Sequence, residues 1–280
     1  MNQLLEVHIL DVGFGDTILV KLPNGRFILV DCHRYSLLQR YLFSKKIEIE
    51  EFELVVATHP HKDHIGGLED VLSNYRVRAF WDSSFRHEIS IYQNLLDKID
   101  VHSEVRFSLP KAGYVMIQGD VQIRVLAPQP IHIAESSSDA NNASIVIKLC
   151  YGTHHGNPFS VLLAGDAQLE SWSQMLAHQQ DIRATVFKVP HHGGKRGCNF
   201  ELIEKISPLT SIVSTSPGKH PGIPDETILD YLKTHSRSRP SPFFRTDIHG
   251  NIVVFANGKR YWVESEVSVR NPFSSRKRVS

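Results

Sequence analysis

The chain has 280 residues, of which 41% are hydrophobic and 22% are charged, a composition typical of globular proteins and incompatible with global disorder. It carries 31 basic and 30 acidic side chains, so a formal net charge of +1 provides no overall field that would attract nucleic acid or an anionic membrane. Any affinity for such partners must therefore be local.

The cysteines and the apolar runs limit the setting in which the protein works. Cys32, Cys150 and Cys198 are widely spaced and form no C-x-x-C pair, so neither a disulfide framework nor a cysteine zinc site is indicated. The first residues lack the basic region and the cleavage site of a signal peptide. No apolar run reaches the roughly 18 to 20 residues that a membrane helix needs. We therefore expect a soluble, cytoplasmic protein with no membrane partner.

The predicted elements begin with short β-branched runs separated by turn residues, which indicate a small antiparallel meander over residues 4–10, 17–22 and 27–32. Helical spacing follows at 36–46, then a buried strand at 53–58 and a helix that begins near His64. Further strands are predicted at 77–82, 105–109, 114–119, 121–128, 143–152, 160–166, 185–190, 211–216, 251–256 and 260–265. Further helices are predicted at 90–100, 168–179, 199–206 and 225–235.

Two runs of strands, each followed by helices, predict two sheets packed face to face with helices outside. This is an αββα sandwich of the α/β (α+β) class. We expect a single domain over residues 1–258. Residues 259–280 would then contain the last strand and a basic tail, which we expect to be mobile.

The strongest signal for chemistry is T-H-P-H-K-D-H at residues 58–64. His59 and His61 alternate by two at a strand end, so their imidazoles can converge, and Asp63 and His64 continue into the turn, where a second metal could be held. A lone histidine is usually structural. Three histidines and an aspartate within six residues, directly after a buried strand, instead indicate a metal site.

The motif H-x-H-x-D-H at residues 59–64 resembles that of the metallo-β-lactamase superfamily at every position. Further motifs follow the order of one branch: L-D-V-G-F-G-D at 10–16, L-V-D-C at 29–32, N-N-A-S at 141–144, L-A-G-D at 163–166, V-P-H-H-G-G at 189–194 and T-D-I-H-G at 246–250. The set resembles the metallo-β-lactamase-like domain of the ComEC-type competence proteins and their stand-alone relatives, which are similar to phosphodiesterases and nucleases. The resemblance covers residues 4–257 and implies the four-layer metallo-β-lactamase sandwich.

The resemblance also implies a ligand set for two divalent ions, Zn²⁺ or Mn²⁺. His59 and His61 would hold one metal, Asp63 and His64 the other, and Asp166 would bridge them. A bridging carboxylate offers two oxygens, and Gly165 lets the backbone turn tightly after the apolar strand.

A histidine of the pair His191 and His192 is the expected sixth ligand, and the sequence does not decide which of the two it is. Asp63 and His220 are the candidate catalytic residues. His220 in G-K-H-P would donate to a leaving oxygen; the alternative is a loop histidine held by Pro221.

Other candidate residues would orient the ligands or contact the substrate. Asp31 matches a buried aspartate that orients the histidine loop in the superfamily. Asp16 fits a tight turn near the metal edge, with a purely structural turn as the alternative. Asn141 lies where many superfamily hydrolases place a third histidine, and it could equally form a turn. Lys188 and Lys195 would complement phosphate, with a solvated surface role as the alternative.

Beside these, His33 replaces the glycine that relatives usually carry, and either a role at the site mouth or simple exposure remains open. The pair His154 and His155 is expected to form a polar turn.

The leading hypothesis is a dinuclear-metal-dependent phosphodiester hydrolase, a nuclease acting on DNA or RNA through a metal-bridging hydroxide. One alternative is hydrolysis of a small-molecule ester, thioester or lactam on the same fold. Another is a module that is inactive alone and is activated by a partner protein encoded alongside it, as in a multi-protein system such as phage defence. The oligomeric state is left open.

Overall fold

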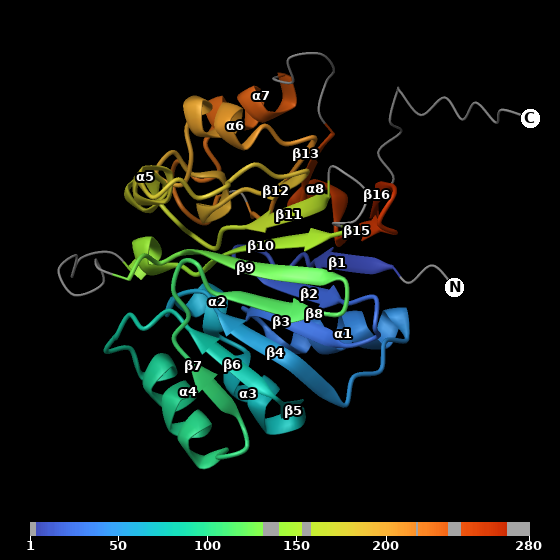
Figure 1. Ribbon diagram of the computed structural model, residues 1–280, viewed down its shortest axis with the longest axis vertical. Helices are drawn as coiled ribbons and strands as arrows, with labels where there is room; N and C mark the ends of the chain where they lie inside the picture. The colour runs from blue at the N-terminus through green and yellow to red at the C-terminus, as the bar shows by residue number, and fades with distance from the viewer. Residues whose placement is uncertain (1–3, 131–139, 153–157, 217, 235–241, 268–280) are drawn as a thin grey trace, which may run out of the picture.

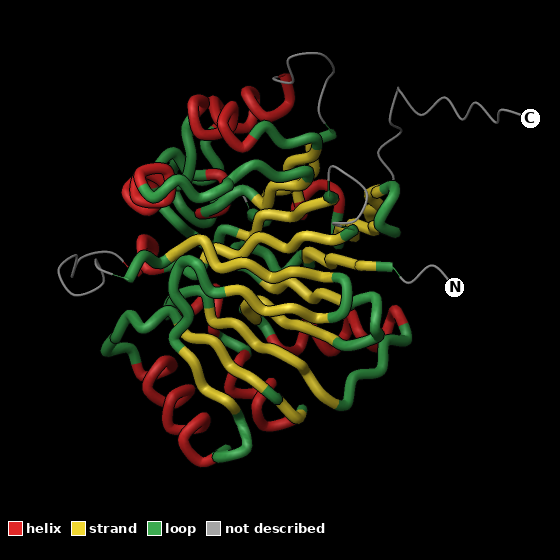
Figure 2. The backbone as a smooth tube through the Cα atoms, in the orientation of Figure 1, coloured by secondary structure: helices red, strands yellow, loops and turns green. Residues whose placement is uncertain are grey.

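Two β-sheets lie face to face, with helices on both outer surfaces, in the computed structural model, which describes residues 4–130, 140–152, 158–216, 218–234 and 242–267 (Figure 1). Figure 2 shows the strands gathered in the middle of the molecule and most helices at its periphery. The predicted αββα sandwich is confirmed.

The first sheet has nine strands and combines an antiparallel part with a parallel part. The antiparallel part contains the predicted meander and the end of the described chain: β1 (Leu5–Ile9), β2 (Thr17–Lys21), β3 (Phe27–Cys32), β15 (Ile252–Ala256) and β16 (Tyr261–Ser265). The parallel part continues from β3 to β4 (Glu51–Ala57), β5 (Arg76–Val77), β6 (Ala79–Asp82) and β7 (Arg106–Ser108). The carboxyl ends of β3 and β4 therefore lie at the same edge of the sheet.

The second sheet has seven strands and is organised in the same way. Its antiparallel strands are β8 (Val115–Gln118), β9 (Val121–Ala127), β10 (Val146–Tyr151) and β11 (Phe159–Leu163). Its parallel strands continue from β11 to β12 (Val186–Lys188), β13 (Thr210–Val213) and β14 (Phe243–Arg245). The loops that follow β11 and β12 consequently leave the sheet at one edge.

The core has three layers because side chains of alternate strand positions point to opposite faces. Val7 of β1 and Val161 of β11 belong to the cluster between the sheets. The outer face of the first sheet packs on α1 (Tyr35–Lys45), α3 (Leu68–Asn74) and α4 (Ser90–Val101). The outer face of the second packs on α5 (Leu169–Ala177), α6 (Phe200–Ile206) and α7 (Glu226–Thr234).

The helix predicted to begin near His64 is divided into α2 (Lys62–Ile65) and α3. The division falls at Gly66 and Gly67, where the chain packs against the end of β3. A Cβ on Gly66 would lie 2.6 Å from the carbonyl oxygen of His33, and a Cβ on Gly67 would lie 2.9 Å from Cys32 Sγ. The two glycines thus let α2, which carries part of the histidine motif, rest directly on β3.

Several short elements were not predicted, because one turn or three residues show no periodicity: β14, α8 (Thr246–His249) and the 3-10 helices η1 (Ala140–Ala143) and η2 (His191–Gly193). The pair His154 and His155 and the tail from residue 268 onward lie outside the described residues. None of the helices in the described part of the chain combines the length and the hydropathy needed to cross a membrane.

Candidate metal centre

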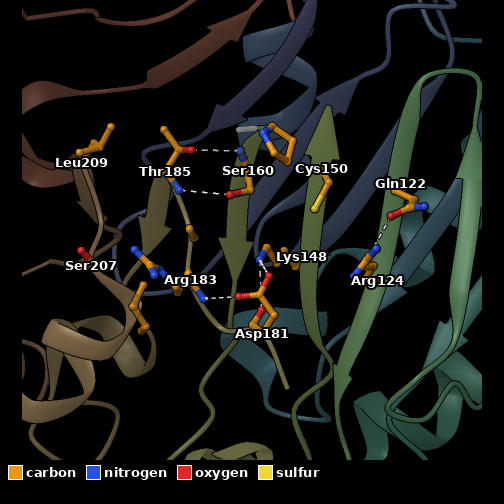
Figure 3. Close-up of a pocket in the computed structure, with 13 residues that line it drawn as sticks. Gln122, Arg124, Lys148, Cys150, Ser160, Asp181, Arg183, Thr185, Ser207 and Leu209 are labelled. Carbon is orange, nitrogen blue, oxygen red and sulfur yellow. Dashed lines mark hydrogen bonds and ion pairs between the residues drawn. The ribbon is translucent and has the colours of Figure 1, made fainter. Parts of the chain in front are cut away.

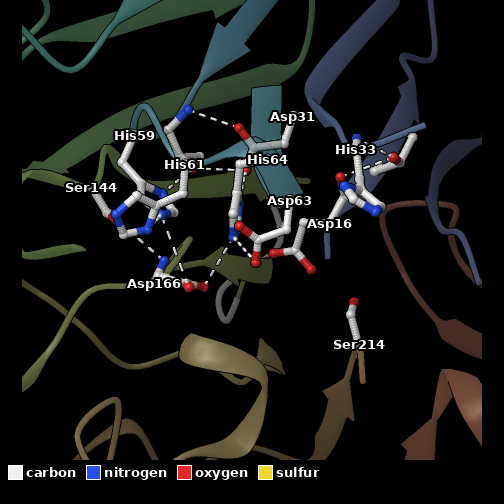
Figure 4. Close-up of polar contacts among 12 residues, drawn as sticks. Asp16, Asp31, His33, His59, His61, Asp63, His64, Ser144, Asp166 and Ser214 are labelled. Carbon is white, nitrogen blue, oxygen red and sulfur yellow. Dashed lines mark hydrogen bonds and ion pairs between the residues drawn. The ribbon is translucent and has the colours of Figure 1, made fainter. Parts of the chain in front are cut away.

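The candidate ligands meet where the carboxyl ends of parallel strands from both sheets face each other (Figure 4). His59, His61, Asp63 and His64 follow β4 of the first sheet, and Asp166 follows β11 of the second. The loop after β12 adds a further histidine. The centre therefore lies at the seam between the sheets, and neither sheet provides it alone.

His59 and His61 turn ring nitrogens toward each other. The hydroxyl of Thr58 donates to Asp31 Oδ2 at 2.7 Å and lies 3.1 Å from His59 Nδ1, so it accepts from that nitrogen. The proton of the neutral His59 ring then sits on Nδ1. Its Nε2 is left unprotonated, 3.1 Å from His61 Nδ1, a spacing compatible with two ring nitrogens on one cation.

Asp31 orients the His64 ring through the nitrogen that faces away from the metal centre. Its Oδ2 accepts from His64 Nδ1–H at 2.7 Å, and its Oδ1 accepts from the backbone N–H of Thr58 at 2.8 Å. Asp31 is 1% exposed and adopts a left-handed backbone with φ 57°, a strained conformation for a residue other than glycine. The bond to Asp31 leaves Nε2 of His64 directed at Asp166 Oδ1, 3.3 Å away. A carboxylate that fixes the tautomer of a ligand histidine acts in this manner.

Asp166 lies between the histidines of the two sheets. Its carboxylate oxygens are 3.3 Å from His64 Nε2, 3.6 Å from His192 Nε2 and 3.9 Å from His59 Nε2. The sequence could not choose between His191 and His192, and the structure brings the His192 ring to the centre. His192 donates through Nδ1 to the Ser214 carbonyl at 3.0 Å, which directs Nε2 toward Asp63 Oδ2 at 3.3 Å. His191 instead donates its backbone N–H to Asp166 Oδ1 at 3.1 Å.

Burial and charge oppose each other in this cluster. Burial raises the pKa of Asp166, but the charges of His192 and His64 outweigh it and hold that pKa well below its usual range. Burial lowers the pKa of His64, but Asp166 and Asp31 outweigh it and raise that pKa well above its usual range. Burial and the neighbouring His64 lower the pKa of His59 well below its usual range. Among these histidines it is therefore His64 whose positive charge is favoured beside the Asp166 carboxylate.

The donor set fits a divalent cation. Within the described residues, the ligand atoms of Asp63, His64, Asp166 and His192 all lie within 4.8 Å of one another. The Nε2 atoms of His64 and His192 are buried and make no hydrogen bond to a described residue. An unsatisfied buried donor or acceptor costs about 1–3 kcal/mol, which a bound cation would recover. Imidazole and carboxylate together are typical ligands of zinc and of other first-row metals.

Two glycines let the loops approach closely enough to build the centre. A Cβ on Gly15 would lie 2.5 Å from the carbonyl oxygen of Asp63, so the turn at 13–16 contacts the histidine loop directly. A Cβ on Gly165 would lie 3.0 Å from Thr58 Cβ, and the φ of Gly165 is +51°. Since L side chains rarely adopt that φ, glycine at 165 allows the Asp166 loop of the second sheet to touch the first.

Asp16 and Lys188 form an ion pair behind the metal ligands. Each side chain is 1% exposed, and Lys188 Nζ contacts Asp16 Oδ2. The backbone N–H of Asp16 also donates to the Asp63 carbonyl at 3.0 Å. The prediction that Lys188 contacts a substrate phosphate is wrong, because a fully buried ammonium that is paired with Asp16 cannot reach a substrate. The pair instead joins the two sheets beneath the centre.

The remaining candidates lie around the centre at different depths. Asn141 is in η1 and is 8% exposed, and the last residue of its motif, Ser144, accepts from the backbone N–H of Asp166 at 3.2 Å. Lys195 is 67% exposed and pairs with Asp225 at 3.2 Å. Ser144 and Thr58 belong to the motifs N-N-A-S and T-H-P-H-K-D-H, but a hydroxyl beside a stronger ligand gives no separate signal in the sequence. The Ser214 carbonyl could not be found, because a backbone acceptor leaves no side-chain signal.

A hollow of about 420 Å³ opens beside the centre. Asp63, which is also a candidate ligand, forms part of its wall. The other lining residues are Phe14, His33, Arg34, Lys62, Gly66, Lys219 and His220. We call it the mouth hollow. The candidate donor His220 is exposed here, and its ring centroid lies 4.3 Å from that of Phe14.

A second basic hollow, of about 580 Å³, lies on the outer face of the second sheet (Figure 3). Arg124 and Lys148 reach it from β9 and β10, and Asp181 and Arg183 from the segment that precedes β12. Lys148 Nζ contacts Asp181 Oδ2 at 2.7 Å. We call it the outer hollow.

Comparison with known proteins assigns the chain to a family. The model of the family described as Anti-Pycsar protein Apyc1 matches residues 12–187, which is more than half of the chain. The chain belongs to the Anti-Pycsar protein Apyc1 family. The region matched by this family model includes the candidate ligands from His59 to Asp166 and ends just before the His191 and His192 pair.

Individual relatives and solved structures match most of the chain. ComE operon protein 3 of Bacillus subtilis (strain 168) is 28% identical over 266 residues, which cover 88% of this chain and 32% of that protein. The chain thus spans about a third of the length of this relative. Among solved structures, the metallo-β-lactamase fold protein YhfI from Bacillus subtilis matches with a TM-score of 0.52 at 13% identity, over 92% of this chain and 99% of that one.

CmlA, a diiron β-hydroxylase from Streptomyces venezuelae, matches with a TM-score of 0.57 at 13% identity, over 92% of this chain and 53% of that one. The chain therefore has the metallo-β-lactamase fold. Because one of these structures is a hydroxylase, the fold alone does not fix the reaction.

Proposed function

We propose that the chain is a dinuclear-metal phosphodiesterase that cleaves DNA or RNA. The observation that carries the proposal is the convergence of imidazole and carboxylate donors from both sheets beside a hollow that contains Arg34, Lys62 and Lys219. Cationic side chains next to a metal site complement the charge of a phosphodiester backbone.

In this proposal His59 and His61 would hold one cation, Asp63, His64 and His192 would hold the other, and Asp166 would contribute to both. When bound, a pair of divalent cations would lower the pKa of a shared water and neutralise charge on the scissile phosphate. Zn²⁺ and Mn²⁺ are the candidate metals.

The chain's own groups supply orientation and a proton. Asp63 is 25% exposed and lines both the centre and the mouth hollow, so a carboxylate oxygen can accept a hydrogen bond from the attacking water and aim it. His220 stands exposed at the same hollow, where a ring N–H can donate to the leaving oxygen.

Membership of the Anti-Pycsar Apyc1 family favours a second candidate, the hydrolysis of a cyclic nucleotide in a phage-defence setting. The same residues would serve that reaction, because a cyclic nucleotide also contains a phosphodiester. The two candidates differ in the number of phosphates that the site must accommodate.

The test is hydrolysis of single- and double-stranded DNA and RNA, of cyclic nucleotides and of bis(p-nitrophenyl) phosphate, with Mn²⁺ or Zn²⁺ added. The Asp63→Ala, His64→Ala double variant serves as the inactive control, and p-nitrophenyl acetate tests for carbon-ester chemistry. We expect metal-dependent cleavage of phosphodiesters that the double variant lacks. Hydrolysis of the acetate alone would replace the proposal with a carbon-ester hydrolase. Bound metal without any hydrolysis would favour an enzyme that a partner protein must activate.

A further inference from the structure

The mouth hollow contains positive charge that no acidic side chain neutralises. Arg34, Lys62 and Lys219 are all exposed, and none of them forms an ion pair with a residue that the structure describes. The nearest acid in the lining is Asp63, which is directed at His192 and His64 of the metal centre. The charge of the hollow is therefore available to an anionic ligand.

Arg34 is held in place rather than free in solvent. Its Nε donates to His33 Nε2 at 3.1 Å, and His33 in turn donates through Nδ1 to the carbonyl oxygen of Lys62 at 3.3 Å. A neutral imidazole can play both parts, because one nitrogen donates while the other accepts. This chain of contacts links Arg34 to the histidine loop that carries the metal ligands.

The His33 ring is itself fixed by its neighbours. A Cβ on Gly15 would lie 2.7 Å from His33 Cγ, so the glycine leaves just enough room for the ring. The backbone N–H of His33 donates to the Asp16 carbonyl and to Thr17 Oγ1, both at 3.0 Å. The guanidinium of Arg34 thus bonds to a ring that contacts Gly15 and the Lys62 carbonyl, on a residue whose backbone is also hydrogen-bonded.

An aromatic surface separates the hollow from the metal ligands. The ring centroid of Phe14 lies 4.2 Å from that of His192 and 4.3 Å from that of His220. Phe14 is half-buried, so part of its ring remains accessible. Exposed aromatic rings beside cationic side chains are the features with which proteins bind the bases and the backbone of single-stranded nucleic acid.

We propose that the mouth hollow is a subsite for a second phosphate of the substrate, next to the phosphate that is cleaved. Arg34, Lys62 and Lys219 would bind that phosphate, and Phe14 with His220 would contact the base between the two. The inference rests on the proposed phosphodiesterase function and adds its substrate class: a linear oligonucleotide with at least two phosphates.

The decisive measurement compares dithymidine monophosphate with the same dinucleotide carrying one additional terminal phosphate, at the 5′ or the 3′ end. We expect kcat/KM to be about tenfold higher for one of the phosphorylated forms, a difference that corresponds to one favourable charge contact. In Arg34→Ala this preference falls toward unity. Arg40→Ala, which removes an exposed arginine of α1 that does not line the hollow, keeps the wild-type preference and serves as the matched control.

Binding provides a second readout that does not depend on catalysis. Fluorescence anisotropy of a labelled pentathymidylate with chelator-treated protein should show that Kd rises with salt concentration. Each cation that contacts a phosphate contributes about 0.7 to the slope of log Kd against log salt. Arg34→Ala should reduce this slope by about that amount, and Arg40→Ala should leave it unchanged.

The outcomes separate the subsite from the proposed function. Hydrolysis of bis(p-nitrophenyl) phosphate together with equal rates on all three dinucleotides would overturn the subsite and leave the phosphodiesterase intact. If no phosphodiester is hydrolysed, the proposed function fails, and the anisotropy experiment alone decides. An unchanged salt slope in Arg34→Ala would then overturn the subsite as well.

Discussion

The mouth hollow and the outer hollow both gather arginine and lysine, but they treat the charge differently. In the outer hollow Lys148 has a side chain only 7% exposed, and Asp181 approaches it at 2.7 Å (Figure 3). Arg124 and Arg183 of the same hollow are exposed and form no ion pair with a described residue. In the mouth hollow none of the three exposed cations has an acidic partner among the described residues. The number of basic side chains is similar in the two places. The outer hollow therefore has one of its three cations neutralised by an acid, and none of its described residues is a candidate metal ligand, whereas the mouth hollow includes Asp63 of the metal centre.

We expect catalysis only at the seam beside the mouth hollow, and the variant with the largest expected loss of activity lies there. Asp166→Ala removes the carboxylate between the histidines of both sheets, so we expect phosphodiesterase activity to fall on the order of 10³-fold or more. Activity and metal content, measured by elemental analysis, should fall together. Asp181→Ala, the matched aspartate of the outer hollow, should retain both. A full metal complement in Asp166→Ala would contradict the assignment.

Asp31→Asn leaves every candidate metal ligand in place and changes only the hydrogen bonds that orient His64. An asparagine cannot accept from both Thr58 and His64 with the same two oxygens, since one becomes an amide donor facing His64 Nδ1. We expect metal affinity to fall about 10- to 100-fold, measured by competition with a coloured chelator. Affinity equal to that of the wild type would show that Asp31 does not orient His64.

Removing the metal tests whether a bound cation at the seam stabilises the fold. The outer hollow contains no candidate metal site in the described part of the chain, so it should not contribute to this effect. A cation at a hundred times its Kd stabilises the folded state by about 3 kcal/mol, because it binds the folded chain and not the unfolded one. Chelation should therefore lower the midpoint of urea unfolding, and re-addition of Zn²⁺ or Mn²⁺ should restore it. The Asp63→Ala, His64→Ala variant should not respond to the chelator. A midpoint that is independent of metal in the wild type would argue against a resident cation.

The smallest effect is expected at the outer hollow. Burial raises the pKa of Asp181, but the hydrogen bond and charge of Lys148 outweigh it and lower that pKa below its usual range. A lowered folded-state pKa means that the pair stabilises the fold at neutral pH, and that this contribution is lost as pH falls below about 4. Asp181→Asn should therefore cost no more than about 1 kcal/mol at neutral pH.

The difference in unfolding free energy between Asp181→Asn and the wild type should shrink in acid, when urea titrations are compared at several pH values. Phosphodiesterase activity at neutral pH should stay within about twofold of the wild type, since most surface changes away from a site are small. A larger loss of activity would mean that the outer hollow also binds substrate.

The sequence revealed the first half of the metal centre because its ligands are neighbours on one loop. His59 to His64 follow a recognisable strand, so period and spacing were enough to predict that they converge. His192 could not be separated from His191, because the direction of each ring depends on left-handed backbone at both, with φ of 50° and 52°. The local sequence pattern does not predict left-handed backbone at two consecutive histidines.

The burial of Lys188 could have been predicted from the sequence. Strand alternation places Lys188 on the same face as Val186, which belongs to the core between the sheets, so its burial follows from the period of two. Its partner Asp16 lies 172 positions away and had no local sign. The mouth hollow could not be predicted for the same reason, since Arg34, Lys62 and Lys219 come from three separate parts of the chain.

The ion pair of Asp16 and Lys188 also constrains how the protein can evolve. Replacing either residue alone leaves a buried charge without its partner, which costs about 3–5 kcal/mol. A domain of ordinary stability has only about 5–15 kcal/mol in total, so each single replacement is close to lethal for folding. A joint replacement by apolar side chains would avoid that penalty, yet the mutational path to it passes through one of the two single changes. Each of the two residues therefore makes the other hard to replace, and substitutions elsewhere in the sheets are tolerated only if they keep the pair intact.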